Sequence, residues 1–138
     1  MKHTATILNR RGFSLILALL LLGGGIAAAQ VGMSAEDALA AGNATALSQL
    51  FNSTVEIRIL DEENVYAKQQ AAVVLDSFFR KYTPFGFSVQ HRNNRDNNSF
   101  LIGTLRCQSE SFRVSLFMKG TGDSQRITQI TIAKATNF

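Results

Sequence analysis

The side chain best suited to chemistry in this chain is His91, because an imidazole can act as a base or bind a ligand near neutral pH. His91 continues an alternating apolar series formed by Phe85, Phe87 and Val89, so the alternation predicts that it faces the interior of the domain. General acid–base chemistry also needs a positioned partner. The alternative interpretation is a histidine that caps the core at the end of a strand.

The acidic residues offer His91 no such partner. Glu56 lies between Val55 and Ile57 in a predicted strand and faces the opposite side. Asp76 falls on the polar side of a predicted helix. Six other acids lie in predicted turns: Asp61, Glu62, Glu63, Asp96, Glu110 and Asp123. We expect no carboxylate to point inward, which argues against an enzyme, and we predict no catalytic residue.

A metal site or cofactor is not expected either. His3 lies in an N-terminal segment that resembles a signal peptide, and His91 alone, without a carboxylate pair, lacks the spacing of metal ligands. Cys107 is the only cysteine, which excludes an intrachain disulfide and a cysteine-based metal site. It is predicted to be a small core residue at the end of a strand.

Tyr66 and Arg106 join His91 as candidates to line a pocket. Both side chains combine an apolar stem or ring with a polar tip, which suits the mouth of a pocket. The alternative interpretation is ordinary exposure or pairing at the surface, where most arginines lie.

These candidates depend on the elements between residues 66 and 91. A long helix is predicted from Tyr66 to the stop at Thr83-Pro84, because proline disfavours helical geometry in the preceding residue. The helix has one apolar face, which we expect to be core, formed by Ala67, Ala71, Val74, Leu75, Phe78 and Tyr82.

Strands are predicted on both sides of this helix. Two short helices, 35–41 after the N-cap Ser34 and 44–51, precede a strand at 55–59 and an acidic turn at 61–64. Four strands follow the long helix and form an antiparallel meander, at 85–91, 100–107, 112–119 and 127–132. Ile127 is out of phase with Ile130 and Ile132, which predicts a bulge or a late strand start.

The first 29 residues have the three-part pattern of a cleaved secretory signal. A basic start precedes an apolar run over residues 13–22, and small residues end at Ala29, the predicted cleavage point. The run is shorter than the ~20 residues that a spanning helix needs. We therefore expect a signal peptide at 1–29 and one domain at 30–138, exported to the periplasm or the medium without a stable membrane anchor.

Two other patterns overlap this segment. Arg10-Arg11 resembles the twin-arginine export signal, although the apolar run favours the general secretory route. Residues 11–16 resemble the start of a type IV prepilin, which would be cut after Gly12. That family carries a glutamate where this chain has Leu17, and its helical stem would be broken here by the glycines at 23–25.

Removal of the signal also changes the charge balance. The chain has 14 basic and 10 acidic residues, and three of the basic ones, Lys2, Arg10 and Arg11, lie in the signal. The remaining part therefore carries 11 basic and 10 acidic residues, a net charge of +1. Its arginines are scattered and form no basic stripe, so nucleic acid is not an expected partner.

The order of these elements resembles the cone-shaped nuclear-transport-factor-2-like domains of the cystatin-like superfamily. Closer still, the chain resembles a family of small exported bacterial proteins known only as a domain of unknown function. The matching residues are Ala41-Gly42-Asn43-Ala44, Leu47-Ser48, Phe51, Tyr66-Ala67-Lys68-Gln69-Gln70-Ala71, Phe78-Phe79, Phe87, His91, Ile102-Gly103-Thr104-Leu105, Phe112-Arg113-Val114 and Ile130-Thr131-Ile132.

The resemblance implies an α+β fold in which a curved antiparallel sheet wraps the long helix and leaves a pocket. It also implies export, and it carries over no catalytic residue. Ala67 stands where the family's pattern has a small hydroxyl residue, which weakens the cap of the long helix.

One strand of the meander is apolar on both faces, through Phe100, Leu101, Ile102 and Leu105. The long helix can cover only one face of the sheet. A second subunit, giving a homodimer through the outer sheet face, or the N-terminal helices would cover the other.

The function predicted from the sequence is an exported, non-catalytic module that binds a small ligand or a protein partner. One alternative is a pocket enzyme of the isomerase or dehydratase kind that uses His91. Another is a pilin-like subunit of the cell envelope.

Overall fold

The computed structural model describes residues 32–136, and the predictions made for residues 1–29 lie outside this range. Residues from Met33 onward belong to one compact unit. Its elements in chain order are α2 (Ala35–Ala41), α3 (Ala44–Ser48), β1 (Phe51–Ile59), β2 (Glu62–Ala67), α4 (Lys68–Tyr82), β3 (Pro84–Arg95), β4 (Asn98–Cys107), β5 (Ser111–Lys119), the 3-10 turn η1 (Gly122–Ser124) and β6 (Arg126–Lys134).

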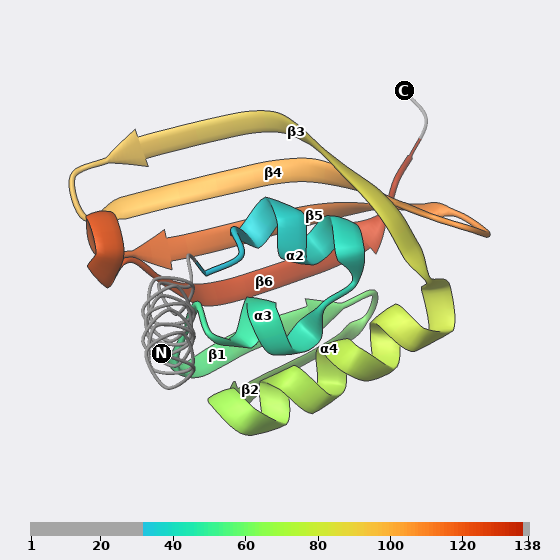
Figure 1. Ribbon diagram of the computed structural model, residues 1–138, viewed down its shortest axis with the longest axis horizontal. Coiled ribbons are helices and arrows are strands. Elements are labelled where there is room, and N and C mark those ends of the chain that lie inside the picture. Colours follow the sequence, from blue (N-terminus) through green and yellow to red (C-terminus); the bar gives the residue numbers. More distant parts are fainter. Residues whose placement is uncertain (1–31, 137–138) are drawn as a thin grey trace, which may run out of the picture. The chain divides into compact units, whose positions relative to one another are not determined.

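The strands of this unit form one curved sheet in the order β2-β1-β6-β5-β4-β3. Helices α2 and α3 cross the middle of one face, and α4 lies along the end formed by β1 and β2 (Figure 1). The predicted α+β class and the helix-on-sheet arrangement are confirmed. One pair differs from the antiparallel expectation, because β1 and β6 run parallel, which makes the sheet mixed.

The core fills the space between the helices and the inner face of the sheet. Phe112 of β5 is fully buried, with its ring centre 5.1 Å from that of Phe78 and 4.7 Å from that of Tyr82 on α4. Burying one such phenylalanine stabilises the fold by about 2–3 kcal/mol. The predicted core face of α4 is confirmed for Ala71, Leu75 and Phe78.

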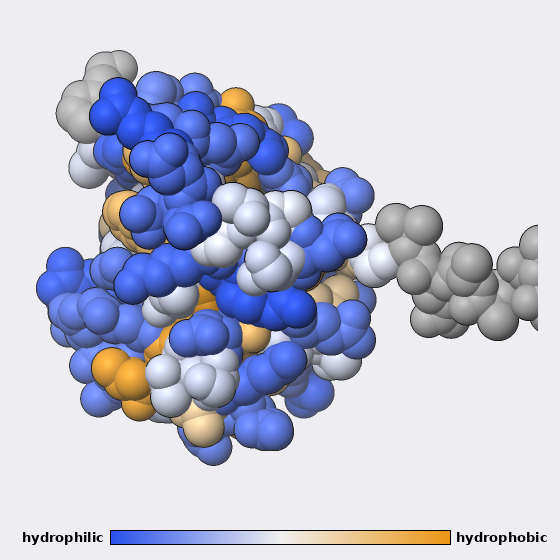
Figure 2. All heavy atoms as spheres, turned by 90° about the vertical axis from the view of Figure 1, so that its left-hand side faces the viewer, coloured by the Kyte–Doolittle hydropathy of each residue, from blue (hydrophilic) through white to orange (hydrophobic). Residues whose placement is uncertain are grey.

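The surface at the end of the domain that carries the β3–β4 turn is mostly hydrophilic (Figure 2).

The N-terminal helices follow the prediction in part. The Ser34 hydroxyl caps α2 by accepting a hydrogen bond from the Asp37 amide, and Gly42 ends the helix with φ of 64°. The second helix is shorter than the expected 44–51, because it ends at Ser48 and Phe51 already opens β1. Phe51 pairs with Ile127 of β6, so a long-range strand pairing overrides the local helical spacing.

The acidic turn expected at 61–64 is wrong for residues 62–64, which begin strand β2, and of the four residues only Asp61 lies in the turn. The chain turns at Leu60, which has φ of 54°, and β2 pairs antiparallel with β1. The Glu63 carboxylate accepts a hydrogen bond from Arg58 Nη2 at 2.5 Å across the pair, which favours a strand despite its acidic composition.

The long helix consequently starts later than predicted. It begins at Lys68, and Tyr66 and Ala67 still belong to β2. No side-chain hydrogen bond from Ala67 caps α4, as its methyl side chain predicted. The predicted stop is confirmed, since α4 ends at Tyr82 and Thr83 adopts a left-handed conformation before Pro84.

Strand β3 contains the feature that overturns the prediction for His91. The pairing of β3 with β4 slips between Val89 and His91, so that Gln90 is an extra residue. Val89 pairs with Gly103, which is buried, whereas His91 pairs with Ile102 on the other face of the sheet. The expectation that His91 faces the interior is therefore wrong, because the bulge reverses the alternation that it was based on.

A second bulge was predicted and is confirmed. The pairing of β5 with β6 slips between Phe117 and Met118, which pair with Gln129 and Ile127. The slip lets Ile127 and Ile130 both reach the core although they are three residues apart.

Candidate functional site

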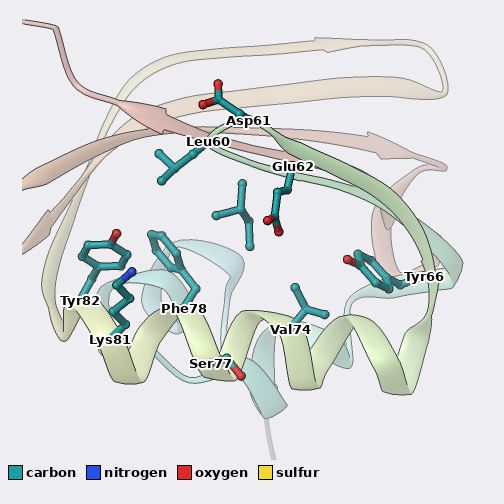
Figure 3. A pocket seen from close by; sticks show the side chains of 10 residues that line it. Leu60, Asp61, Glu62, Tyr66, Val74, Ser77, Phe78, Lys81 and Tyr82 are labelled. Carbon is teal, nitrogen blue, oxygen red and sulfur yellow. The ribbon is translucent and has the colours of Figure 1, made fainter.

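A cleft of about 590 Å³ lies between the β1–β2 hairpin and α4 (Figure 3). Its volume falls within the range of about 300–1,000 Å³ that is usual for small-molecule sites. The lining residues are Ile59, Leu60, Asp61, Glu62, Tyr66, Val74, Ser77, Phe78, Lys81 and Tyr82.

The periodicities of the two elements explain how these side chains converge. On β2, Glu62 and Tyr66 pair with Ile59 and Val55 of β1, and paired residues lie on the same face of a sheet. Val55 is buried, so this is the inner face of the hairpin, turned towards α4. The α4 residues of the cleft recur at steps of three and four from Val74 to Tyr82, which places them on one side of the helix.

The floor of the cleft is apolar and firmly packed. Phe78 is 5% exposed, and its ring centre lies 4.8 Å from that of Tyr82. Leu60 and Val74 are half-buried above and beside it. A ligand placed on this floor would exchange water for hydrophobic contact without a rearrangement of the core.

Three charged side chains line the cleft, Asp61, Glu62 and Lys81, and Asp61 points away from its floor (Figure 3). The Glu62 carboxylate extends from the hairpin into the cleft towards α4 (Figure 3). At the other end, the ammonium group of Lys81 lies 5.2 Å from the ring centre of Tyr82. Among residues 32–136, neither Glu62 nor Lys81 takes part in an ion pair within 4.0 Å. The sequence predicts a turn at Glu62 and no carboxylate that points inward. That prediction is wrong for Glu62, whose carboxylate points into the cleft.

Of the three predicted pocket residues, the structure places only Tyr66 in the cleft. Tyr66 is half-buried, and its hydroxyl points into the cleft from the end opposite Tyr82 (Figure 3). His91 is exposed on the outer face of the sheet, with its ring centre 5.4 Å from that of Phe100. The structure therefore does not bring Tyr66 and His91 together.

Arg106 also lies away from the cleft. It alternates with buried Leu105 and Cys107 on β4, so its side chain is on the outer face. Its guanidinium carbon is 5.8 Å from the ring centre of Phe85.

Sequence reasoning missed Glu62, Lys81 and Tyr82 as site residues. No local signal marks Glu62, because Glu62, Glu63 and Asn64 are all polar and lack the apolar–polar alternation of a strand. One signal in the sequence could have identified Tyr82. The spacing Val74-Phe78-Tyr82 is that of one helix face.

Other features of the described residues lie outside the cleft. Within residues 32–136, no three His, Cys, Asp or Glu side chains are grouped so as to hold a metal ion. Cys107 is buried at the end of β4 as predicted, and burial, followed by the nearby Glu110, raises the pKa of its thiol. None of the helices in this part of the chain has the length and hydropathy that a membrane span requires.

Comparison with known proteins identifies a family and several structures that are similar to this chain. A family model described as a domain of unknown function (DUF4783) matches residues 33–133. The crystal structure of a DUF4783 family protein from Bacteroides ovatus has a TM-score of 0.72 and is 31% identical, covering 78% of this chain and 97% of its own. The comparison with curated proteins finds no match.

More distant structures show the same fold. A domain of unknown function with a cystatin-like fold from Nostoc punctiforme has a TM-score of 0.60 at 9% identity, covering 75% of this chain and 72% of its own. An NTF2-like protein of unknown function from Cytophaga hutchinsonii has a TM-score of 0.50 at 13% identity, covering 71% and 80%. These matches confirm the resemblance on which the fold prediction rested.

Proposed function

The chain belongs to the DUF4783 family, a domain of unknown function with an NTF2-like fold, and we propose that it is a binding module whose cleft takes a small molecule. The ligand class that we propose has an apolar body and a protonated amine. The observation that carries this proposal is the Glu62 carboxylate, which extends over the apolar floor formed by Val74 and Phe78.

The charge of Glu62 argues for a cationic group in the ligand. A carboxylate that faces an apolar wall interacts more strongly with an opposite charge than it would in bulk water, because the wall lowers the local dielectric. The rings of Tyr66 and Tyr82 at the two ends of the cleft can also attract a cation. Lys81 already lies over Tyr82, which leaves the half of the cleft between Glu62 and Tyr66 for the ligand's amine.

The arrangement favours binding over catalysis. None of the hydrogen bonds found between residues 32 and 136 links the side chains of Glu62, Tyr66 and Tyr82 to one another, so the cleft has no coupled acid and base. An enzyme that uses His91 would need that side chain in the cleft, and His91 instead lies beside Phe100. We therefore expect His91→Ala to leave ligand binding unchanged.

A protein of residues 30–138 suits the binding test. The Bacteroides ovatus relative, matched over 97% of its own chain by 78% of this one, crystallises as a folded domain. The probes are 2-phenylethylamine and 3-phenylpropionate, which share a phenyl group and a two-carbon chain and differ in charge. Titration calorimetry should show the amine binding about tenfold more tightly than the acid, or better.

Two neighbouring glutamates provide a matched control. Glu62→Gln removes the carboxylate that extends over the apolar floor and should abolish the preference for the amine. Glu63→Gln removes the same charge from the opposite face and should preserve that preference, because Glu63 pairs with Arg58. Tighter binding of 3-phenylpropionate to the unmodified protein would overturn the proposal.

We further propose that the domain works outside the cytoplasm, on the strength of the signal-like residues 1–29. The intact mass of the protein recovered from the producing cells distinguishes the alternatives. A chain that starts at Gln30 is expected for a secreted binding module. A chain that starts at Phe13 would instead support the pilin-like subunit.

A further inference from the structure

The outer face of the sheet carries a continuous row of rings. His91, Phe100 and Phe117 come from the adjacent strands β3, β4 and β5, with ring centres 5.4 Å and 6.1 Å apart. Phe117 is 45% exposed, although its neighbours Leu116 and Val114 on the same strand are fully buried on the other face. The described helices pack on that other face, so nothing within residues 32–136 covers this row.

Beside Phe117 the same face is hollowed. A hollow of about 490 Å³ is lined on this face by Glu56, Asn98, Phe117, Lys119 and Gln129. A surface that carries a protruding ring beside a hollow can pack against a second copy of itself. In a two-fold dimer, the ring of each copy then lies in the hollow of the other. We infer that this face is the interface of a symmetric dimer of the chain, in which Phe117 of each copy enters the hollow of its partner.

The charges around the hollow fit a second copy. Glu56 on β1 is aligned with Gln129 and Phe117 in a row across the strands, about 10 Å from Phe117 at the usual strand spacing. Lys119 lies two residues along β5 from Phe117, about 7 Å away. Two-fold symmetry that sets Glu56 against the partner's Lys119 thus pairs opposite charges twice.

These positions also indicate how the two sheets cross. Glu56 is displaced from Phe117 across the strands, whereas Lys119 is displaced along one strand. The two meet between copies only if the strands of one sheet cross those of the other at a large angle. That is the orthogonal mode of sheet packing.

The face is large enough for such a dimer. A nine-residue strand is about 31 Å long, and six strands span about 24 Å from the first to the last. The resulting area is comparable with the ~800 Å² that each partner contributes to a typical stable interface. The cleft between the hairpin and α4 lies on the opposite side, so dimerisation leaves it open.

The test is the mass of the protein of residues 30–138 in solution, measured by sedimentation from micromolar to millimolar concentration. The expected mass is twice that of the chain at the upper end. Phe117→Lys should give the monomer throughout, and its unfolding temperature should equal that of the unmodified protein at a concentration where both are monomeric. Val73→Lys, at an exposed position of α4, is the control that should stay dimeric.

Charge reversal then tests the proposed pairing. Glu56→Lys alone and Lys119→Glu alone should each raise the dissociation constant about tenfold or more. The double variant should return it to near its original value, because each ion pair is rebuilt with the signs exchanged. A monomeric mass at millimolar concentration, or a double variant no better than the single ones, would overturn the inference.

Discussion

Glu62 and Glu63 are neighbours on β2, yet they face opposite sides of the hairpin and differ in their partners. Glu63 on the outer face accepts a hydrogen bond from Arg58 at 2.5 Å. Glu62 on the inner face extends into the cleft and makes no ion pair among the described residues. The acid of the outer face is paired within the chain, and the acid of the inner face is the one that we propose to bind a ligand.

The aromatic residues show the opposite arrangement. Phe112 and Phe117 lie five residues apart on β5 and on opposite faces of the sheet. Phe112 is fully buried against Phe78, whereas Phe117 is 45% exposed. The aromatic ring on the inner face is therefore buried in the core, whereas the ring on the outer face remains partly exposed to solvent. Together, the two proposals give one sheet two binding surfaces of different chemistry.

The largest expected difference between the two faces is in stability. Phe112→Ala should lower the free energy of unfolding by about 3–5 kcal/mol, because it leaves a cavity in the core. Phe117→Ala should change the stability of the monomer by less than about 1 kcal/mol. Urea denaturation at a protein concentration below that of dimerisation measures both. Similar losses from the two substitutions would remove the distinction between the faces.

The next effect is on ligand affinity. Val74→Lys places a long cationic side chain in the cleft and should weaken the binding of 2-phenylethylamine about tenfold or more. Val73→Lys makes the same change at the adjacent position, which is 58% exposed and does not line the cleft. Calorimetry on the two variants should separate them clearly. Equal losses would place the binding site elsewhere.

The smallest effect concerns the pKa values of the two acids on the outer face, Glu56 and Glu63. Hydrogen bonding with Glu63 raises the pKa of Glu56, and the same bond, followed by the hydrogen bond from Arg58 and then its charge, lowers the pKa of Glu63. Glu63→Gln should therefore bring the pKa of Glu56 down, as measured by NMR titration of the side-chain carboxyl carbons. Glu62→Gln, on the opposite face, should leave it unchanged.

The directions of these pKa shifts determine how the stability of the fold depends on pH. The raised pKa of Glu56 gives stability that is present at low pH and is lost as the pH rises through that pKa. The lowered pKa of Glu63 gives stability that is present above its ordinary pKa and is lost as the pH falls through the lowered one. In Glu63→Gln the contribution of Glu63 disappears and that of Glu56 becomes smaller, so the unfolding temperature should depend less on pH across the acidic range.

The parts of the fold that the sequence predicted depend on local signals. The cap at Ser34, the stop before Pro84 and the apolar face around Phe78 each involve residues within a few positions of one another. Alternation likewise located the strands of the meander, and the phase of Ile127 located a bulge. In each case the capping, steric or periodic signal involves residues that are close together in the sequence.

The parts that it did not predict depend on distant partners. Phe51 leaves its helical spacing to pair with Ile127, and the acidic β2 becomes a strand because Arg58 faces Glu63 across the hairpin. The candidate site was affected in the same way. Tyr66 was identified, Glu62 was missed with its hairpin, and the bulge at Gln90 turned His91 to the outer face.

The central claim, that the cleft binds an apolar amine, is tested most directly by mapping 2-phenylethylamine on the amide NMR spectrum of the protein of residues 30–138. The predicted result is that the largest shifts fall on Leu60, Glu62, Tyr66, Val74 and Phe78. The amides of Phe100 and Phe117 on the outer face should stay unchanged. Shifts concentrated on β4 and β5, or none at saturating amine, would contradict it.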